Sequence, residues 1–420
     1  MKTIVSISPV RIEADTRTFK QAASISRFGY TSIVVEAEKS DLEKSMLPFE
    51  LYSLSDAVLN GNQLSVAVES PTSRDSGVKQ NVKAVLRRLG LTRLLSFAQN
   101  VRVFISGLAR YLYRHGLMTF RSTPRASLYV LHSPLQFPAV YFLTKKYKAP
   151  FIYDAHDFYG RIEESDEGIP LNERWLKSVY RRVESLCVKR AAAVITVSQG
   201  IADLQRAKFG CKSIVIRNVQ DARLGTATIT NLRDVLQLPA DRFLLVTVGQ
   251  AKPGQALREM LDAMYTLPAT IHLALVGRGY EQYLDEIRSK DLQERVHIVP
   301  PVKSYEVVPF IRTADAAIIL YYARSPNYTN CLPNGFFQSV TAGLPLLYPE
   351  LPEIQKIAEQ YELGIAINPQ SADSIRVGVL KLNDPATAMI YKRNVQAAMH
   401  DLSWEKEESL LNDLIRKTIG

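Results

Sequence analysis

The sequence has few cysteines and no long hydrophobic run. Its three cysteines, Cys187, Cys211 and Cys331, are far apart and form no CxxC pair, which argues against a disulfide framework or a structural zinc site and fits a reducing cytosol. No window approaches the roughly 18 uncharged apolar residues of a membrane-spanning helix. Pro9 and Arg11 interrupt the N-terminal apolar run, which therefore predicts a first strand rather than a signal peptide. We expect a cytoplasmic protein, free or peripheral on the inner face of the cell membrane.

Acidic residues are absent from Ser76 to Tyr153, although this segment holds 13 Lys or Arg. The rest of the chain carries 39 basic and 42 acidic residues, so the segment supplies the whole net charge of +10. Residues 100–116 within it are amphipathic on a helical wheel, with Val101, Ile105, Leu108 and Leu112 on one stripe and Arg102, Arg110 and Arg114 on another face. Two interpretations stay open: a packed helix with a solvated basic side, or a surface facing an anionic membrane or a pyrophosphate. No DNA- or RNA-reading module accompanies the charge, so nucleic acid is not expected.

Metal-ligand patterns are also missing. The sequence has no Asp-x-Asp pair, and we find no cluster of His, Cys and carboxylate residues in it. Divalent cations in proteins are held by such groups, so we expect no bound metal.

The length of 420 residues predicts more than one hydrophobic core. Short apolar runs alternate with helical patterns in two stretches, which predicts βαβ units and two parallel sheets. The runs begin at residues 2, 31, 127, 150, 192 and 213 in the first stretch and at 243, 271, 296, 316, 344 and 364 in the second. Residues 219–242 lack strong periodicity and indicate a linker. We place the domains at 1–220 and 221–395, followed by a closing helix at 396–420.

Ligands of doubly wound sheets bind beyond the carboxyl ends of the strands, so the residues after these runs are the candidates. A glycine-bearing turn follows the run 243–248 and enters a helix near Gln255. Exposed amides and the helix dipole make such a turn an anion site, and Lys252 adds a full charge. A second turn puts Gly277 and Gly279 between a strand and a helix. Such turns are common, so each alone is weak evidence of phosphate binding.

A third loop is more specific. Leu332 and Pro333 lead into a helix that begins near Asn334. Its first amides can bind a diphosphate, while Asn330 and Gln338 can donate hydrogen bonds to hydroxyls. Asn334 can equally be a plain N-cap.

The first half contains His156 just after a predicted strand. Asp154 precedes it by two residues, and Asp157 directly follows it. His156 can meet a sugar in a cleft, while Asp154 can hold the strand end. A lone histidine is more often structural, and the acidic residues at 163–167 are expected to be solvated.

In this order, the loops resemble the family 4 glycosyltransferases of GT-B fold, retaining enzymes of polysaccharide and glycolipid assembly. The similarity covers nearly the whole chain and is clear in DAHDFYG, in the glycine turn at 249–254, in LPNGFFQSVTAGLPLL and in the closing SWEKEESLLNDLI. Asp15 and Arg17 form a commonly seen Asp-x-Arg. The resemblance implies two Rossmann-like domains facing each other across a cleft, with the C-terminal helix crossing back to the first.

The resemblance also implies a nucleoside-diphosphate sugar donor, a glycan or lipid-linked saccharide acceptor, retention of anomeric configuration and no metal or other cofactor. The second domain would hold most of the donor. The resemblance assigns the phosphate turn to Gly249, Lys252 and Gly254, and the next loop to Gly277 and Gly279. It assigns the base contact to the backbone near Val302 and Glu306. It places His156 at the donor sugar and Arg17 on the acceptor or membrane side.

Four positions depart from the family pattern, and one of them is Gln199, which stands where the family's turn has glutamate. The glutamates of its Glu-x7-Glu motif are replaced by Asn330 and Gln338, and Gln255 stands where a basic residue is usual. Neutral groups bind an anion less strongly than charged ones. One hypothesis is therefore an active transferase working on a membrane-bound acceptor, and another is a degenerate GT-B protein that binds a glycan or partner without turnover. A third is another GT-B enzyme, such as a sugar-nucleotide epimerase.

Overall fold

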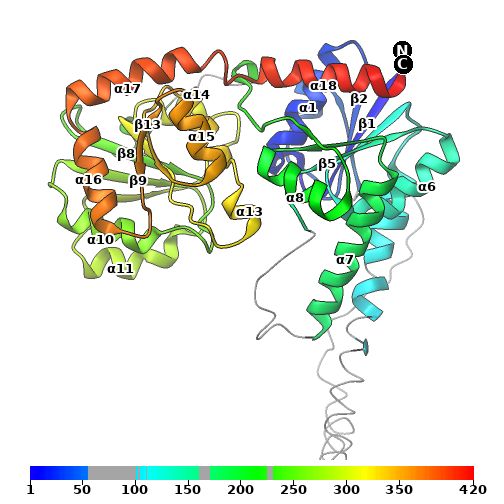
Figure 1. Ribbon diagram of the computed structural model, residues 1–420, viewed down its shortest axis with the longest axis horizontal. Helices are drawn as coiled ribbons and strands as arrows, with labels where there is room; N and C mark the ends of the chain where they lie inside the picture. Colours follow the sequence, from blue (N-terminus) through cyan, green and yellow to red (C-terminus); the bar gives the residue numbers. More distant parts are fainter. Residues whose placement is uncertain (55–100, 103–104, 110, 160–170, 225–229) are drawn as a thin grey trace, which may run out of the picture.

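The protein has two α/β domains, each built on one parallel sheet (Figure 1). The computed structural model describes residues 1–54, 101–102, 105–109, 111–159, 171–224 and 230–420. The first sheet has the order β3-β2-β1-β4-β5-β6-β7 and the second the order β10-β9-β8-β11-β12-β13. The predicted fold class is therefore confirmed, and the non-consecutive neighbours are the crossovers that βαβ units produce.

Every run that was expected to be a strand is one, and the structure adds β3. The strands are β1 Thr3–Ser8, β2 Thr31–Glu36, β3 Glu50–Ser53, β4 Leu128–Leu131, β5 Phe151–Ala155, β6 Ala193–Thr196, β7 Ile214–Val215, β8 Phe243–Val248, β9 Ile271–Val276, β10 Val296–Val299, β11 Ala316–Ile318, β12 Leu346–Pro349 and β13 Gly364–Ile367. The strand β3 is short, lies at the sheet edge and buries only alternate residues, so it has no continuous apolar run to reveal it.

Helices cover both sheets and account for most of the remaining described chain. They are α1 Thr16–Arg27, α5 Thr119–Ser122, α6 Phe137–Tyr147, α7 Leu171–Arg190, α8 Gln199–Phe209, α9 Leu232–Leu236, α10 Leu257–Thr266, α11 Leu284–Ser289, α12 Val307–Ile311, α13 Pro326–Thr329, α14 Asn334–Thr341, α15 Pro352–Gln360, α16 Ala372–Leu382, α17 Pro385–Ala398 and α18 Trp404–Ile419. A π-helical segment, η3 Leu112–Met118, runs into α5.

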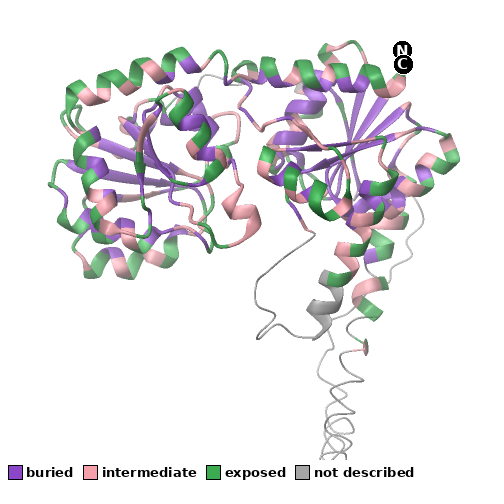
Figure 2. Ribbon diagram, viewed as in Figure 1, coloured by how far each residue is buried: buried purple, intermediate pink, exposed green. Residues whose placement is uncertain are grey.

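Each sheet has a core on both faces. In β1, Val5 belongs to the core that includes Leu143 of α6, and Ile4 belongs to the opposite core with Trp404. Adjacent residues of a strand point to opposite faces, so the near-continuous apolar runs of the sequence reflect sheets buried on both sides. The inner strands are accordingly almost entirely buried, the edge strands β3 and β7 are less so, and the helices show exposed outer faces (Figure 2).

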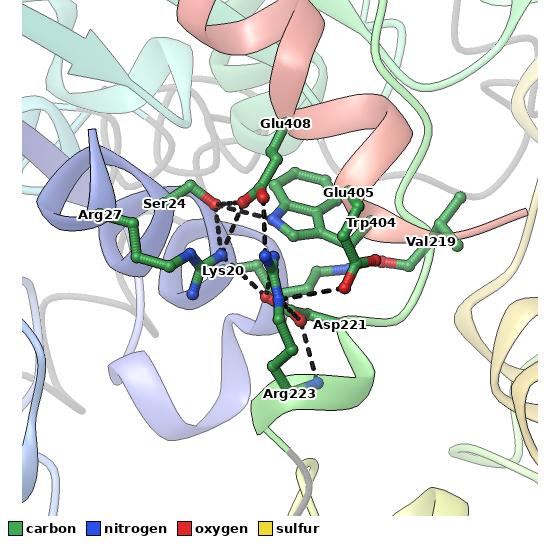
Figure 3. Close-up of polar contacts among 9 residues, drawn as sticks. All are labelled: Lys20, Ser24, Arg27, Val219, Asp221, Arg223, Trp404, Glu405 and Glu408. Atoms are coloured by element: carbon green, nitrogen blue, oxygen red, sulfur yellow. Dashed lines mark hydrogen bonds and ion pairs between the residues drawn. The ribbon is translucent and has the colours of Figure 1, made fainter. Parts of the chain in front are cut away.

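The last helix, α18, packs on the first domain although α17 lies on the second (Figure 1). Trp404 is fully buried and donates a hydrogen bond from Nε1 to Ser24 Oγ of α1 at 2.8 Å. Lys20 lies with its Nζ 4.9 Å from the centre of the Trp404 ring and donates to the Val219 carbonyl (Figure 3). The chain thus returns to its first helix after completing the second domain.

A charged network fixes the outgoing linker at the same place. Asp221 is fully buried and accepts hydrogen bonds from Arg27 and Arg223. Both arginines also contact Glu408 of α18, each at 2.7 to 2.8 Å (Figure 3). Burial by itself raises the pKa of Glu408, but the hydrogen bonds from Arg223, Arg27 and Ser24 outweigh it and lower the pKa to about 2. The residues that leave and re-enter the first domain are therefore bonded to one another.

Candidate active site

His156 follows β5 at the carboxyl end of the first sheet, where its side chain is 29% exposed. The residue beneath it, Asp154, is fully buried. Arg17 of α1 donates hydrogen bonds from Nε and Nη2 to the two oxygens of this carboxylate, each at 2.8 Å. Gln21 donates to the same carboxylate at 2.6 Å. The end of β5 is thus anchored by two side chains from the first helix.

Arg17 is not a surface residue, so its predicted place on the acceptor or membrane side is wrong. It is only 2% exposed, and its third hydrogen bond goes to the Ile216 carbonyl. An aspartate within an inner strand is a buried charge that needs a partner, and an arginine on the neighbouring helix supplies it. Asp15 takes another role, since its side chain accepts the Thr18 amide as the N-cap of α1.

His132 is the site residue that the sequence interpretation missed. Its Nδ1 lies 3.2 Å from His156 Nε2 and 3.2 Å from Asp154 Oδ2, and its side chain is fully buried. The signal was present, because His132 follows β4 just as His156 follows β5. These strands are neighbours with Leu131 opposite Tyr153, so the residues that follow them meet at one edge.

The charges of this cluster depend on one another. Burial acts to raise the pKa of Asp154, but the Arg17 guanidinium and the two histidines hold it well below its usual range. Burial likewise acts to lower the pKa of His156, but the hydrogen bond and charge of Asp154 raise it above 6.5. The raised pKa extends the pH range over which His156 carries its second proton.

The expectation that the chain has no cluster of histidine and carboxylate is wrong. Ligand atoms of His132, Asp154 and His156 lie within 4.8 Å of one another. Both oxygens of Asp154 already accept hydrogen bonds from Arg17, however, and a cation bound here would lie against that guanidinium. Electrostatic repulsion disfavours a resident metal, whereas a cluster that shares protons fits these contacts.

In the second domain, the two glycine turns that were predicted to bind phosphate pack against each other. A Cβ on Gly277 would lie 1.7 Å from the Gly249 carbonyl oxygen, so only glycine fits there. Both residues, like Gly279, have positive φ, a conformation that favours glycine. The Ala251 amide also donates to the Arg278 carbonyl at 2.9 Å. The two turns therefore form one surface at the carboxyl ends of β8 and β9.

The first of these turns is braced by its own residues. Gln255 accepts a hydrogen bond from the backbone amide of Lys252 at 2.9 Å, and its backbone forms a β-bridge with Tyr321. The helix begins at Leu257, two residues later than expected. Gln255 thus shapes the turn, while the side chain of Lys252 is exposed. Gly254 is buried with φ of 98°.

The third loop adjoins the same surface through α14. A Cβ on Gly335 would lie 2.9 Å from the Val248 carbonyl oxygen, so the first turn of α14 abuts the end of β8. The helix follows Pro333 and has no side-chain cap at its N-terminus. Leu332 and Gln338 are each 6% exposed. The predicted helix start is present beside the glycine turns.

Asn334 and Asn330 face the first domain. Asn334 is the first residue of α14 rather than its cap, and its Oδ1 accepts a hydrogen bond from Asn218 at 2.6 Å. The Asn330 side chain donates to the Pro326 carbonyl within its own domain. Its backbone carbonyl accepts from Ser198 of the first domain at 2.8 Å. Both predicted donor residues thus contribute to contact between the domains.

The predicted base-binding residues lie beyond the edge strand β10. Val302 and Glu306 are half-buried, and Glu306 closes a turn by accepting the Lys303 amide at 3.3 Å. The Gly277 amide donates to the last residue of β10, Val299, at 3.0 Å. The loop that carries Val302 therefore continues the row of strand ends that begins with the glycine turns.

The short helix α13 connects the two halves of the site. Asn327 bonds both backbone groups of Phe158, two residues after His156, at 2.8 and 3.1 Å. The next residue, Tyr328, packs on the glycine turn so closely that a Cβ on Gly254 would lie 2.8 Å from its ring. The histidine loop and the glycine turn therefore meet at neighbouring residues of α13.

The basic segment exposes part of its apolar stripe. Ile105 is 59% and Leu112 48% exposed, and Leu117 adds a third apolar side chain at 42%. Arg102 is exposed, and Arg114 contacts Glu38 at 3.3 Å. Arg110 lies outside the described residues. In the part of the chain that is described, no helix has both the length and the apolar character needed to cross a bilayer.

Comparisons with known proteins agree with this architecture. Residues 62–219 match the model of a glycosyl transferase 4-like domain, and residues 242–384 match that of glycosyl transferases group 1. Together the two models match well over half of the chain. No curated protein sequence gives a significant match.

Solved structures of similar fold span nearly the whole chain. Sucrose-phosphate synthase from Thermosynechococcus elongatus has a TM-score of 0.67 at 14% identity, covering 99% of both chains. HepE from Anabaena, in complex with UDP-glucose, has a TM-score of 0.63 at 14% identity over 99% of this chain and 100% of its own. WaaG, a glycosyltransferase involved in lipopolysaccharide biosynthesis, has a TM-score of 0.59 at 14% identity over 98% of this chain and 99% of its own.

Proposed function

The chain belongs to the family 4-like glycosyltransferases of GT-B fold, and on that premise we propose that it transfers a sugar from a nucleoside-diphosphate donor to a glycan or lipid-linked saccharide. The transfer is metal-independent and retains the anomeric configuration. It takes place at the cytoplasmic face of the membrane, in the assembly of a cell-surface polysaccharide.

One observation carries the proposal. Through α13, the loop of His156 and the turn of Gly254 are held against each other, although they belong to different domains. A sugar nucleotide has an anionic diphosphate at one end of the reacting bond and a neutral sugar at the other. Backbone amides and Lys252 suit the former, and a half-exposed imidazole suits the latter.

The electrostatics of the site fit departure of a nucleoside diphosphate. Negative charge grows on the leaving phosphate during transfer, and the uncapped start of α14 directs backbone amides toward such charge. Asp154 favours the imidazolium form of His156, which adds positive charge near the reacting carbon. His156 acts by position and charge rather than as a nucleophile. Two solved structures of HepE are complexes with UDP and with UDP-glucose, which supports a donor of this class.

The test separates binding from transfer. A panel of nucleoside diphosphates and their sugars is screened by thermal shift, because a ligand that binds only the folded state raises the melting temperature. The hit is then assayed for transfer and donor hydrolysis with wild type and His156→Ala. We expect His156→Ala to abolish transfer and keep nucleotide binding, while His400→Ala, an exposed histidine of the second domain, changes neither. Equal turnover of wild type and His156→Ala would refute the role assigned to His156.

The exposed apolar and basic side chains around η3 form the membrane-docking surface in this proposal. Leu112 and Leu117 enter the headgroup region, while basic residues such as Arg102 attract anionic lipid. Each basic residue near an acidic bilayer adds about 1 kcal/mol of attraction. Arg114 contributes less because Glu38 already contacts it.

Vesicle sedimentation tests this surface. Wild type should sediment with vesicles of phosphatidylcholine and phosphatidylglycerol but not with phosphatidylcholine alone. Charge reversal of Arg102, Arg110 and Arg114 should release it, whereas reversal of three arginines paired to neighbouring aspartates elsewhere, Arg206, Arg288 and Arg376, should not. A wild-type protein that never sediments contradicts membrane docking but leaves the donor proposal standing.

A second candidate function is binding without turnover. The observation in its favour is that the Asn330 side chain donates to the Pro326 carbonyl and the Gln255 side chain accepts the Lys252 amide, so both side chains already bond groups of their own domain. The thermal-shift screen and the transfer and hydrolysis assays described above separate the two functions. Tight nucleotide binding with neither transfer nor hydrolysis, across the full acceptor panel, would favour the binding protein.

A further inference from the structure

Three polar contacts join the two domains next to the candidate site. In the first, Asn327 of the second domain pairs with the backbone of Phe158, accepting its N–H at 2.8 Å and donating to its C=O at 3.1 Å. The Asn327 side-chain amide thus bonds both the N–H and the C=O of Phe158, as a neighbouring strand in a sheet would. Since Phe158 is two residues from His156, the second domain holds the histidine loop in place.

The second contact is a helix cap supplied by the other domain. Glu353 in the first turn of α15 accepts the backbone amides of Gln199 and Gly200 at 3.3 and 2.7 Å. These are the first residues of α8, where amides lack helical partners and the dipole favours negative charge. The Glu353 carboxylate therefore stabilises α8 only while the domains touch.

The third contact explains a glycine. Ser198, the N-cap of α8, donates to the Asn330 carbonyl at 2.8 Å. The side chain of Asn330 lies so close to Gly200 that a Cβ there would be 2.0 Å from Asn330 Oδ1. Gly200 lies within a helix, where the backbone does not require glycine. Its missing side chain serves the contact with the other domain.

We propose that these contacts form an interdomain clasp in which Asn327 is a positioning residue for His156. The clasp consists of Phe158, Ser198, Gln199 and Gly200 from the first domain and of Asn327, Asn330 and Glu353 from the second. When the domains part, Phe158 loses both partners, the first turn of α8 loses the Glu353 carboxylate, and His156 loses its fixed place opposite the glycine turns. The role assigned to Asn327 rests on the proposed function, but the clasp itself does not.

The clasp also gives a reason for Asn330 at a position where a charged residue would interfere. Asn330 and Glu353 both contact Gly200. A glutamate at residue 330 would bring a second carboxylate next to that of Glu353, and like charges that close repel. The substitution Asn330→Glu should therefore open the clasp, and adding Glu353→Gln should partly restore it.

Amide hydrogen exchange followed by NMR tests the clasp without any assay of activity. Among the described residues, the acceptors of the Phe158, Gln199 and Gly200 amides lie across the domain boundary, so the protection of these amides reports contact between the domains. Each lost hydrogen bond is worth about fivefold in an equilibrium constant. Asn327→Ala should reduce Phe158 protection by roughly 25-fold, and Gly200→Ala should reduce that of all three.

Two controls separate the clasp from general loss of stability. The Ala202 amide bonds the Ser198 carbonyl within α8 and should keep its protection in every variant. Asn394→Ala removes a half-buried asparagine whose side chain donates to Glu362 of its own domain, and it should leave the three amides unchanged. Unprotected Phe158 and Gly200 amides in wild type, or unchanged protection in Asn327→Ala, would overturn the clasp.

Kinetics then test the positioning role. Asn327→Ala should lower kcat at least about tenfold while nucleoside-diphosphate affinity changes by less than about twofold, because the glycine turns remain intact. Unchanged kcat alongside lost protection would refute the positioning role and keep the clasp. An enzyme without turnover on any acceptor would count against the proposed function, and the exchange results would still decide the clasp.

Discussion

Arg17 and Asp154 form a two-pronged ion pair inside the first domain, with Nε to Oδ2 and Nη2 to Oδ1 both at 2.8 Å. Their side chains are 2% and 0% exposed. The pair joins α1 to the end of β5, and the same carboxylate contacts His132 and His156. The ion pair that joins α1 to β5 therefore also fixes the carboxylate that contacts the two histidines.

Removing the arginine should be costly. Arg17→Met leaves Asp154 buried and uncompensated, which predicts a loss of about 3 to 5 kcal/mol in the free energy of unfolding of the first domain. Urea denaturation measures it. Arg206→Met, which removes an exposed arginine paired to Asp203, should cost less than about 1 kcal/mol. A similarly small loss for Arg17→Met would show that the pair is not the anchor described here.

The sequence predicted the sheets well because buried parallel strands leave continuous apolar runs, as in FLLVTV of β8 and IHLALV of β9. Position relative to a strand end also located the glycine turns and His156. The sequence did not show which residues far apart in the chain contact one another. The partners His132 and Asp154, and the pairing of Asn327 with Phe158, depend on strand order and on how the domains meet. Such geometry has no local signature.

The pKa of His156 should depend on Asp154. Because the carboxylate raises that pKa above 6.5, Asp154→Asn should lower it, and NMR titration of the imidazole C–H signals would show the change. His297 in the second domain, whose pKa is lowered by burial, should titrate identically in both proteins. If His156 titrates at the same pH in Asp154→Asn, the carboxylate does not control its charge.

The sign of the linked stability follows from the same shift. The folded state binds the His156 proton more tightly than the unfolded chain, so this stabilisation is complete below pH 6.5. It is lost as the pH rises through the raised pKa of the folded state. Transfer should decline over the same range if the imidazolium form is the one that serves the donor.

Glu184 should make the first domain less stable as the pH rises from acidic to neutral. The residue is fully buried on α7, its Oε1 lies 3.5 Å from the Tyr153 hydroxyl, and its Oε2 has no hydrogen-bond partner among the described residues. Burial raises the pKa of its carboxyl from 4.5 to about 7. The folded state therefore retains this proton where the unfolded chain has released it, and stability falls as the pH rises from 4.5 to 7.

Glu184→Gln removes this dependence, because the amide stays neutral. The variant should be more stable than wild type by about 3 kcal/mol above pH 7, with the difference vanishing near pH 4. Thermal denaturation over a pH series measures it. Glu359→Gln, at a carboxylate on α15 that bonds Gln355 at the surface, serves as the control and should leave the pH dependence unchanged. Equal stability of Glu184→Gln and wild type at pH 8 would contradict a buried neutral carboxyl.

Trp404 should stabilise the first domain although it lies near the end of the chain. It is fully buried against Ile4 and Leu128, and its Nε1 bonds Ser24 (Figure 3). Trp404→Ala leaves a large cavity and should cost about 3 to 5 kcal/mol. Trp404→Phe keeps a ring but loses the hydrogen bond, and it should cost less.

Calorimetry should show the first domain melting early in both variants while the second domain, which makes no core contact with Trp404, melts as in wild type. Leu410→Ala, at a 46% exposed position of the same helix, should change neither transition. A single transition shifted equally for both domains would mean that α18 stabilises the protein through the second domain instead.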